Sequence, residues 1–287
     1  MAPKRPANAA MFPLLGATLA LAALAACEGL DVQPGTTGLL QVFAEPSISQ
    51  AAEWAIDKYD ADKRYRGTMI LANKPFAGEE LYIKLFIDNA SDPDSGVRTA
   101  ATRALGNHGG PEHVPVILKS LQDPDKLVRL EAARALQRVH NPIAIDPLIK
   151  ECDDRKEIDS EVRAEAADAL GQYAEPRVLA SLQKSMADSN LSVNYSALRS
   201  LRTLTGQDFG LDRLAWRLWL DQSGDPFKAR LAYTYPVFRR DKTTLEYVPF
   251  VPGPPNEPEG ATPAGLPQGG EPVTPATGDK TPPEPPK

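Results

Sequence analysis

The chain has 287 residues, of which 42% are hydrophobic and 24% are charged, and its 32 basic and 38 acidic side chains give a formal net charge of -6. This acidic balance argues against nucleic acid as a partner, because domains that bind it carry a basic surface. The two cysteines exclude a fold held together by a disulfide framework.

An apolar run near the N-terminus has the pattern of an export signal. Lys4 and Arg5 form a short positive segment, and residues 11–26 are apolar apart from Thr18. The run is shorter than the ~20 residues that cross a bilayer as a helix. It ends in small residues, which suit a signal peptidase. We therefore expect residues 1–26 to be a signal peptide.

The run ends at a cysteine, in the sequence LAAC at residues 24–27, which resembles the lipobox of bacterial lipoproteins. The resemblance implies that diacylglycerol is attached to the Cys27 sulfur, that the chain is cut before Cys27, and that the new amine is acylated. In that family an Asp after the cysteine often retains the protein at the inner membrane. Glu28 therefore favours the outer membrane, facing the periplasm. A cleaved signal with an incidental cysteine and a short uncleaved anchor remain as alternatives.

Four segments in the middle of the chain align with one another, beginning at Val97, Val128, Val162 and Val193 and therefore spaced by 31, 34 and 31 residues. In each, apolar or small residues recur at positions i, i+4, i+7 and i+8, the spacing of one face of an α-helix. The acid ahead of each segment is expected to cap free N–H groups at or near the helix start; these acids are Asp94, Asp125, Asp159 and Asp188.

A second apolar segment follows each of the first three copies, at residues 111–121, 143–151 and 176–186, so each unit is a helix–turn–helix. A fainter fifth copy lies upstream, with Tyr65 in the column of Val97. One such unit cannot bury its apolar face alone, but a stack of them can. We therefore predict an all-α fold, an α-solenoid of about five helix pairs over residues 49–221.

The repeat DPDxxVRxxAARAL, best seen at residues 123–136, resembles bacterial HEAT repeats of the kind first recognised in phycobilisome-lyase proteins. In that family, the arginine after the valine joins an acid in the turn of its own or the next repeat. The resemblance therefore implies a structural ladder that contains Arg98, Arg129 and Arg163. Asn194 takes this position in the fourth copy.

The repeats need a cap at each end. Trp54 is expected in the N-terminal cap. At the other end, Gly206 and Gly210 break the pattern before a short helix that carries Trp216 and Trp219. Two tryptophans three apart on a helix usually cover a core, although a ligand-stacking role stays open.

The segments outside the repeats differ from them in composition. Residues 27–48 are predicted to be a tether, and residues 222–251 an extended or irregular segment packed on or near the solenoid. Residues 252–287 are rich in Pro, Gly, Thr and Glu. Such a segment cannot bury enough apolar surface to offset the entropy of ordering, so we predict that it is disordered.

The sequence offers little for catalysis. The three histidines, His108, His113 and His140, have no cysteine cluster or HExxH helix near them to complete a zinc site. The acids around Cys152 would raise its thiol pKa and so disfavour reactivity. Neither a nucleophile elbow nor a phosphate-binding loop is present. We expect no enzymatic activity, no metal and no cofactor.

The remaining candidate is a protein-binding surface. In HEAT architecture the second helix of each pair lines the concave side. Arginine and tyrosine favour interfaces. We therefore expect a partner to contact the groove that contains Leu130, Arg134, Arg138, Tyr195, Arg199 and Arg202. A solvated charged helix face is an equally open interpretation.

These features predict a membrane-anchored periplasmic scaffold or assembly factor that binds an acidic or extended polypeptide. Two alternatives remain: a bilin-lyase-like chaperone, against which the export signal argues, and a structural envelope component whose tail reaches the cell wall. The sequence predicts neither the identity of the partner nor the oligomeric state.

Overall fold

The structure is a computed structural model that describes residues 46–237 and 259–267. From Ile48 onward the described residues belong to one compact unit. Its α-helices are α2 (Ile48–Ala55), α3 (Ala61–Ala72), α4 (Glu80–Asn89), α5 (Ser95–His108), α6 (Val114–Ser120), α7 (Lys126–Arg138), α8 (Ile145–Glu151), α9 (Ser160–Leu170), α10 (Pro176–Ser185), α11 (Leu191–Thr205) and α12 (Arg213–Gln222). The 3-10 turns η2 (Pro111–His113) and η3 (Pro142–Ala144) precede α6 and α8, and the strands are β1 (Tyr235–Val237) and β2 (Glu259–Ala261).

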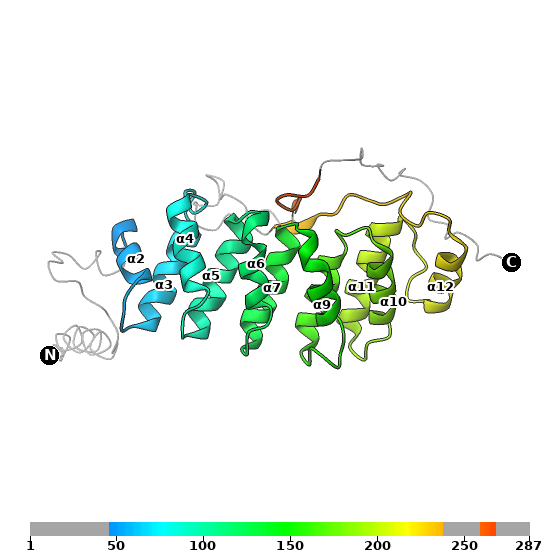
Figure 1. Ribbon diagram of the computed structural model, residues 1–287, viewed down its shortest axis with the longest axis horizontal. Coiled ribbons are helices and arrows are strands. Elements are labelled where there is room, and N and C mark those ends of the chain that lie inside the picture. Colours follow the sequence, from blue (N-terminus) through cyan, green and yellow to red (C-terminus); the bar gives the residue numbers. More distant parts are fainter. Residues whose placement is uncertain (1–45, 238–258, 268–287) are drawn as a thin grey trace, which may run out of the picture. The chain divides into compact units, whose positions relative to one another are not determined.

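The helices form two layers (Figure 1). Helices α3, α5, α7, α9 and α11 pack side by side in this order, and we call them the long-helix layer. Helices α4, α6, α8 and α10 pack against α5, α7, α9 and α11 respectively. The α-solenoid predicted from the repeat is therefore confirmed. None of the described helices combines the length and the apolar character that a membrane span requires.

The apolar columns of the repeat form the core of this stack. Val97, Ala101, Ala104 and Leu105 of α5 are fully buried, and the equivalent residues of α7, α9 and α11 are all 2% exposed or less. Burial of a leucine or valine side chain contributes ~1.5–3 kcal/mol, so each repeat adds a similar increment to the stability of the stack.

The predicted helix caps are confirmed for three of the four helices. Asp94, Asp125 and Asp159 are the N-caps of α5, α7 and α9, and each side chain accepts a backbone N–H of the first turn at 2.8–3.1 Å. For α11 the N-cap is instead Asn190, which accepts from the Ser192 N–H at 2.9 Å, while Asp188 accepts the Asn190 N–H at 2.7 Å just ahead of the helix. Asp188 lies two residues earlier, where the other repeats carry the acid of the arginine ladder.

The fifth copy begins two residues earlier than predicted. Asp60 caps α3 by accepting from the Lys63 N–H at 3.1 Å. The interval from Asp60 to Asp94 is 34 residues (94 − 60), so Lys63 and not Tyr65 occupies the column of Val97. Tyr65 is the better apolar match, but the capping acid fixes the helix start and with it the register.

The C-terminal cap is built on a tryptophan, as predicted. Trp216 of α12 is fully buried, and its indole N–H donates to the Gly210 carbonyl at 2.9 Å. The Phe209 ring meets it edge-on with ring centroids 5.1 Å apart, and Trp219 lies farther out, with ring centroids 6.5 Å apart. Trp216 therefore covers the last apolar face of the repeats.

Part of the segment predicted to be disordered is ordered. β2 pairs antiparallel with β1, with Tyr235 opposite Ala261. Ala264 forms a parallel bridge with Val139 at the end of α7. The prediction is therefore wrong for residues 259–267. Backbone hydrogen bonds order these residues, and no large apolar side chain is needed to do so. The rest of the predicted tail, residues 238–251, and residues 27–45 of the predicted tether, including Cys27, lie outside the described residues.

Candidate functional site

A ladder of ion pairs joins the turns of successive repeats. Its four rungs, here called the turn ladder, are Arg64–Asp92, Arg98–Asp123, Arg129–Glu157 and Arg163–Asp188, each with two N–H donors on one carboxylate at 2.6–3.1 Å. The predicted ladder of Arg98, Arg129 and Arg163 is thus present, and Arg64 extends it by one repeat.

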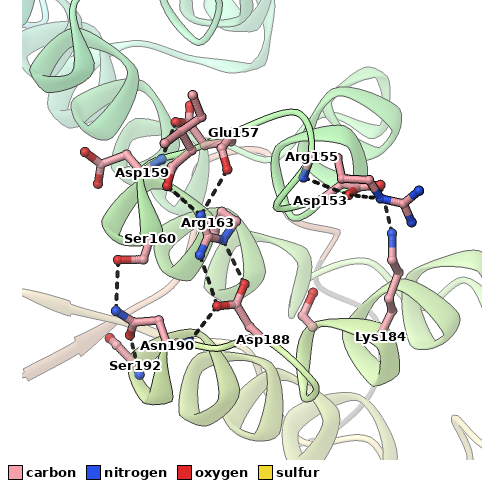
Figure 2. A network of polar contacts seen from close by, with 12 residues as sticks. Asp153, Arg155, Glu157, Asp159, Ser160, Arg163, Lys184, Asp188, Asn190 and Ser192 are labelled. Carbon is pink, nitrogen blue, oxygen red and sulfur yellow. Dashed lines mark hydrogen bonds and ion pairs between the residues drawn. The ribbon is translucent and has the colours of Figure 1, made fainter.

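Each arginine of the turn ladder also holds its own turn. Figure 2 shows Arg163 between Glu157, whose carbonyl accepts an N–H at 3.0 Å, and Asp188 of the next repeat. Burial alone would raise the pKa of the Asp188 carboxyl, but the hydrogen bonds from Arg163 hold it below its ordinary value. At the next position of the column, Asn194 has a buried side-chain oxygen with no hydrogen-bond partner among the described residues.

Two of the arginines predicted to face a partner, Arg134 and Arg199, belong with Arg103 to a second set of ion pairs, here called the face network. Arg103 pairs with Glu131 at 2.8 Å, Arg134 pairs with Glu165 at 2.9 Å, and Arg199 pairs with Asp168 at 2.6 Å. Each pair joins neighbouring helices of the long-helix layer. Burial raises the pKa of the Asp168 carboxyl, although Arg199 opposes the change.

Two residues of one predicted column have opposite exposure. Leu130 is 8% exposed, so its place on an accessible surface was wrong. It lies on α7, which packs between α5 and α9, and the equivalent Ala164 of α9 is also buried. Tyr195 holds the same position on α11 and is 52% exposed, because no further helix of the long-helix layer follows α11.

The other two predicted arginines lie near the C-terminal ends of α7 and α11. Arg138 donates to the Asn107 side-chain oxygen at 2.9 Å, and burial lowers the pKa of its guanidinium. Arg202 pairs with Asp208 at 2.7 Å, and its Nε atom is buried without a hydrogen-bond partner in the described part of the chain. The structure therefore brings Tyr195 and Arg199 together on α11. Of the other predicted residues, Arg138 lies on α7 and Leu130 is buried.

An extended segment of the chain lies along the C-terminal ends of α7 and α11, near Arg138. We call residues 229–237 and 259–267 the strap. The Leu231 N–H donates to the Thr203 carbonyl of α11 at 2.7 Å, and Ala264 exchanges two backbone hydrogen bonds of 2.8 Å with Arg138 and His140. Figure 1 shows the strap running from α12 back toward α7. Of residues 222–251, for which packing on or near the solenoid was predicted, Leu231 bonds to α11, and residues 238–251 lie outside the described residues.

The three histidines have structural contacts. The His108 Nε2 atom lies 2.7 Å from the Ala72 carbonyl, and the His113 Nδ1 atom accepts the Gly110 N–H at 2.9 Å. His140 stacks on Tyr173 with ring centroids 4.8 Å apart. In residues 46–237 and 259–267, no three His, Cys, Asp or Glu side chains gather as a metal site. Burial raises the pKa of the Cys152 thiol to about 12.

A shallow cavity of about 300 Å³ opens on the turn side, lined in part by Arg129, Lys150, Glu151 and Glu157. It lies at the repeat that begins at Val162, whose interval of 34 residues exceeds the 31 residues of the repeat before it (162 − 128 against 128 − 97), so the longer turn before α9 accounts for it. Arg129 and Glu157, a rung of the turn ladder, are among its lining residues, which favours a structural origin.

Sequence reasoning missed the acids of the face network and the second part of the strap, residues 259–267. The acids carry a signal in their spacing, since Arg103 and Glu131 are 28 residues apart and Arg134 and Glu165 are 31 apart, close to one repeat. The second part of the strap carries no comparable signal, because its contacts with the helices are made largely by the backbone of Ala264.

Comparison with known proteins agrees with this architecture. Residues 83–158 match the family of HEAT repeats, and residues 162–188 match the PBS lyase HEAT-like repeat. The matched residues lie between α4 and the turn before α11 and support the presence of HEAT repeats in this part of the chain. No curated protein matches the chain.

Several solved structures are similar in fold. The Escherichia coli protein YibA is 20% identical, with 61% of this chain and 63% of YibA covered and a TM-score of 0.46. The matched region therefore spans less than two thirds of YibA. A designed armadillo repeat protein is 16% identical, with 63% and 96% covered and a TM-score of 0.45. The CpcE–CpcF complex of phycocyanin lyase from Nostoc sp. PCC7120 is 22% identical, with 60% and 80% covered and a TM-score of 0.38.

Proposed function

We propose that this HEAT-repeat protein is a non-catalytic scaffold of the cell envelope, tethered to a membrane through Cys27 and binding a partner polypeptide on the free face of α11. The observation that carries the binding surface is the exposure of Tyr195 and Arg199 on this face. Their side chains are 52% and 66% exposed, and they stand at the end of the long-helix layer.

The geometry of Arg199 supports a binding role over a freely solvated side chain. Two of its N–H groups donate to Asp168 at 2.9 and 2.6 Å, which fixes the guanidinium while it stays exposed. A fixed side chain loses less conformational entropy when a partner binds it. Tyrosine and arginine are also the side chains that most often dominate binding energies at interfaces.

The proposed lipid attachment at Cys27 rests on the sequence LAAC at residues 24–27. One acyl chain holds a protein weakly at a membrane and several hold it firmly, since each buried CH₂ contributes ~0.8 kcal/mol. The test is incorporation of radiolabelled palmitate in cells. The wild-type chain should be labelled, Cys27→Ser should not, and the control Cys152→Ala should keep the label. Label that persists in Cys27→Ser would contradict the tether.

The binding surface is tested by a photo-crosslinking amino acid placed at Tyr195 in cells, with mass spectrometry of the products. The matched control is Leu127, which is 51% exposed but lies at the start of α7. We expect a defined crosslinked protein from position 195 and none of that protein from position 127. Products that are the same from both positions, or absent from both, would argue against this surface.

A further inference from the structure

We propose that the strap occupies a site for an extended segment of a partner polypeptide, and that the partner segment replaces it there. This inference rests on the proposed scaffold function and names the chemistry of the partner. The strap is a segment of this chain already seated on the solenoid, so its contacts show what the site accepts.

The contacts that hold the strap to the helices are largely independent of its sequence. The Leu231 N–H donates to the Thr203 carbonyl, and the Ala264 N–H and carbonyl bond to the Arg138 carbonyl and the His140 N–H. Each of these bonds uses backbone atoms of the strap. An extended chain from another protein can form the same bonds, which is the basis of recognition by strand addition.

Side chains along the first part of the strap alternate between the solenoid and solvent. Tyr233, Tyr235 and Val237 are half-buried, whereas Thr234 and Pro236 are exposed. Burial, together with the nearby carboxylate of Asp168, raises the pKa of Tyr233 well above its ordinary value, so the phenol stays neutral. The site thus accepts alternate aromatic and aliphatic side chains, and Tyr233 lies near Asp168 of the face network.

The second part of the strap requires a glycine at one position. Gly265 has a φ of +79°, and a Cβ atom there would lie 2.2 Å from the Pro111 Cγ atom. Any residue with a side chain would therefore be strained and would also clash at this point. The partner segment we infer is extended, carries alternate tyrosine and aliphatic residues, and has a glycine where the chain passes Pro111.

The strap is suited to exchange because little apolar surface holds it. Leu231 is partly exposed, and β1 and β2 form a ribbon of two strands of three residues each. Two-stranded ribbons are marginally stable without further packing. Segments with few buried apolar contacts open at low free energy. The strap can therefore leave while the helices stay folded.

The test uses the full chain and a fluorescent peptide with the sequence of residues 229–237, measured by fluorescence anisotropy. In the wild type, the tethered strap competes with the peptide at an effective concentration on the order of millimolar. In Tyr233→Ser with Tyr235→Ser the strap is weakened, and we expect the peptide to bind at least tenfold more tightly than to wild type. The matched control, Thr234→Ser with Pro236→Ser, changes outward-facing residues and should bind the peptide as wild type does.

Equal peptide affinity for wild type and Tyr233→Ser/Tyr235→Ser, or no binding to either, would overturn the inference. Thermal unfolding of each variant checks that the helices remain folded. Failure here is distinguishable from failure of the proposed function, because crosslinking from Tyr195 does not depend on the strap peptide. If the crosslinked partner is still found while the peptide result is negative, the proposed scaffold function is kept and the strap site is rejected.

Discussion

Arg163 and Asp188 form the most buried rung of the turn ladder, with Nε and Oδ2 2.8 Å apart and side chains 6% and 3% exposed. The same guanidinium donates to the carbonyls of Glu157 and Ile158 at 3.0 and 2.8 Å (Figure 2). One side chain therefore fixes the turn before α9 and joins it to the turn before α11.

Removal of this arginine should be costly. Arg163→Ala leaves Asp188 buried without its partner, and breaking a buried pair in this way costs ~3–5 kcal/mol. Urea unfolding followed by circular dichroism measures the change. Arg155→Ala, at an exposed arginine of the same turn, should alter the free energy of unfolding by less than about 0.5 kcal/mol. If Arg163→Ala lowers the free energy of unfolding by no more than this, the turn ladder does not stabilise the fold as predicted.

The cap should depend on Trp216. Replacing this fully buried side chain in Trp216→Ala leaves a cavity and should cost ~3–5 kcal/mol. Leu214→Ala, at an exposed leucine of the same helix, is the control and should have little effect. Chemical denaturation of both variants decides the point, and similar losses would show that α12 does not seal the core through Trp216.

Stability should fall on acidification through His140. Burial lowers the pKa of its imidazole below the ordinary value of 6.5, with a hydrogen bond to Gln172 opposing the shift. The folded state therefore favours the neutral ring. The stabilisation is fully present above pH 6.5 and is lost as pH falls from there through the lowered pKa of the folded state.

Urea unfolding between pH 7.5 and 5 measures this dependence. His140→Gln should show a smaller decrease over this range than wild type, because the variant has no proton to take up at this position. An identical decrease in both proteins would assign the pH dependence to other groups.

Cys152 should be inert in the folded protein. Burial raises the pKa of its thiol to about 12, so almost no thiolate forms at neutral pH. In a Cys27→Ser background, reaction with a thiol reagent at pH 8 should be negligible until denaturant is added. Fast labelling of the native chain would mean that the end of α8 opens readily.

The fold was predictable because the same types of side chain recur with the period of the repeat. The buried columns that begin with Val97 and Val128, and the ladder arginines that follow them, recur at intervals that only a stacked fold explains. The register of α3 was not predictable from apolar residues alone, since Asp60 and not Tyr65 determines where that helix starts.

The site was harder to predict for two physical reasons. Glu131 and Asp168 have the pattern of a solvated charged face, and only the stacking of the helices brings them to Arg103 and Arg199. The second part of the strap, residues 259–267, is held largely by backbone groups of Ala264, which leave no mark in composition or periodicity.

The central claim is that the exposed face of α11 binds a partner polypeptide. The most direct test measures the dissociation constant of the protein crosslinked from position 195 for wild type, Tyr195→Ala and the equally exposed control Leu127→Ala. The account predicts binding at least tenfold weaker for Tyr195→Ala and unchanged for Leu127→Ala, as expected for a tyrosine that contributes at least ~1.4 kcal/mol to an interface. Unchanged affinity for Tyr195→Ala would contradict it.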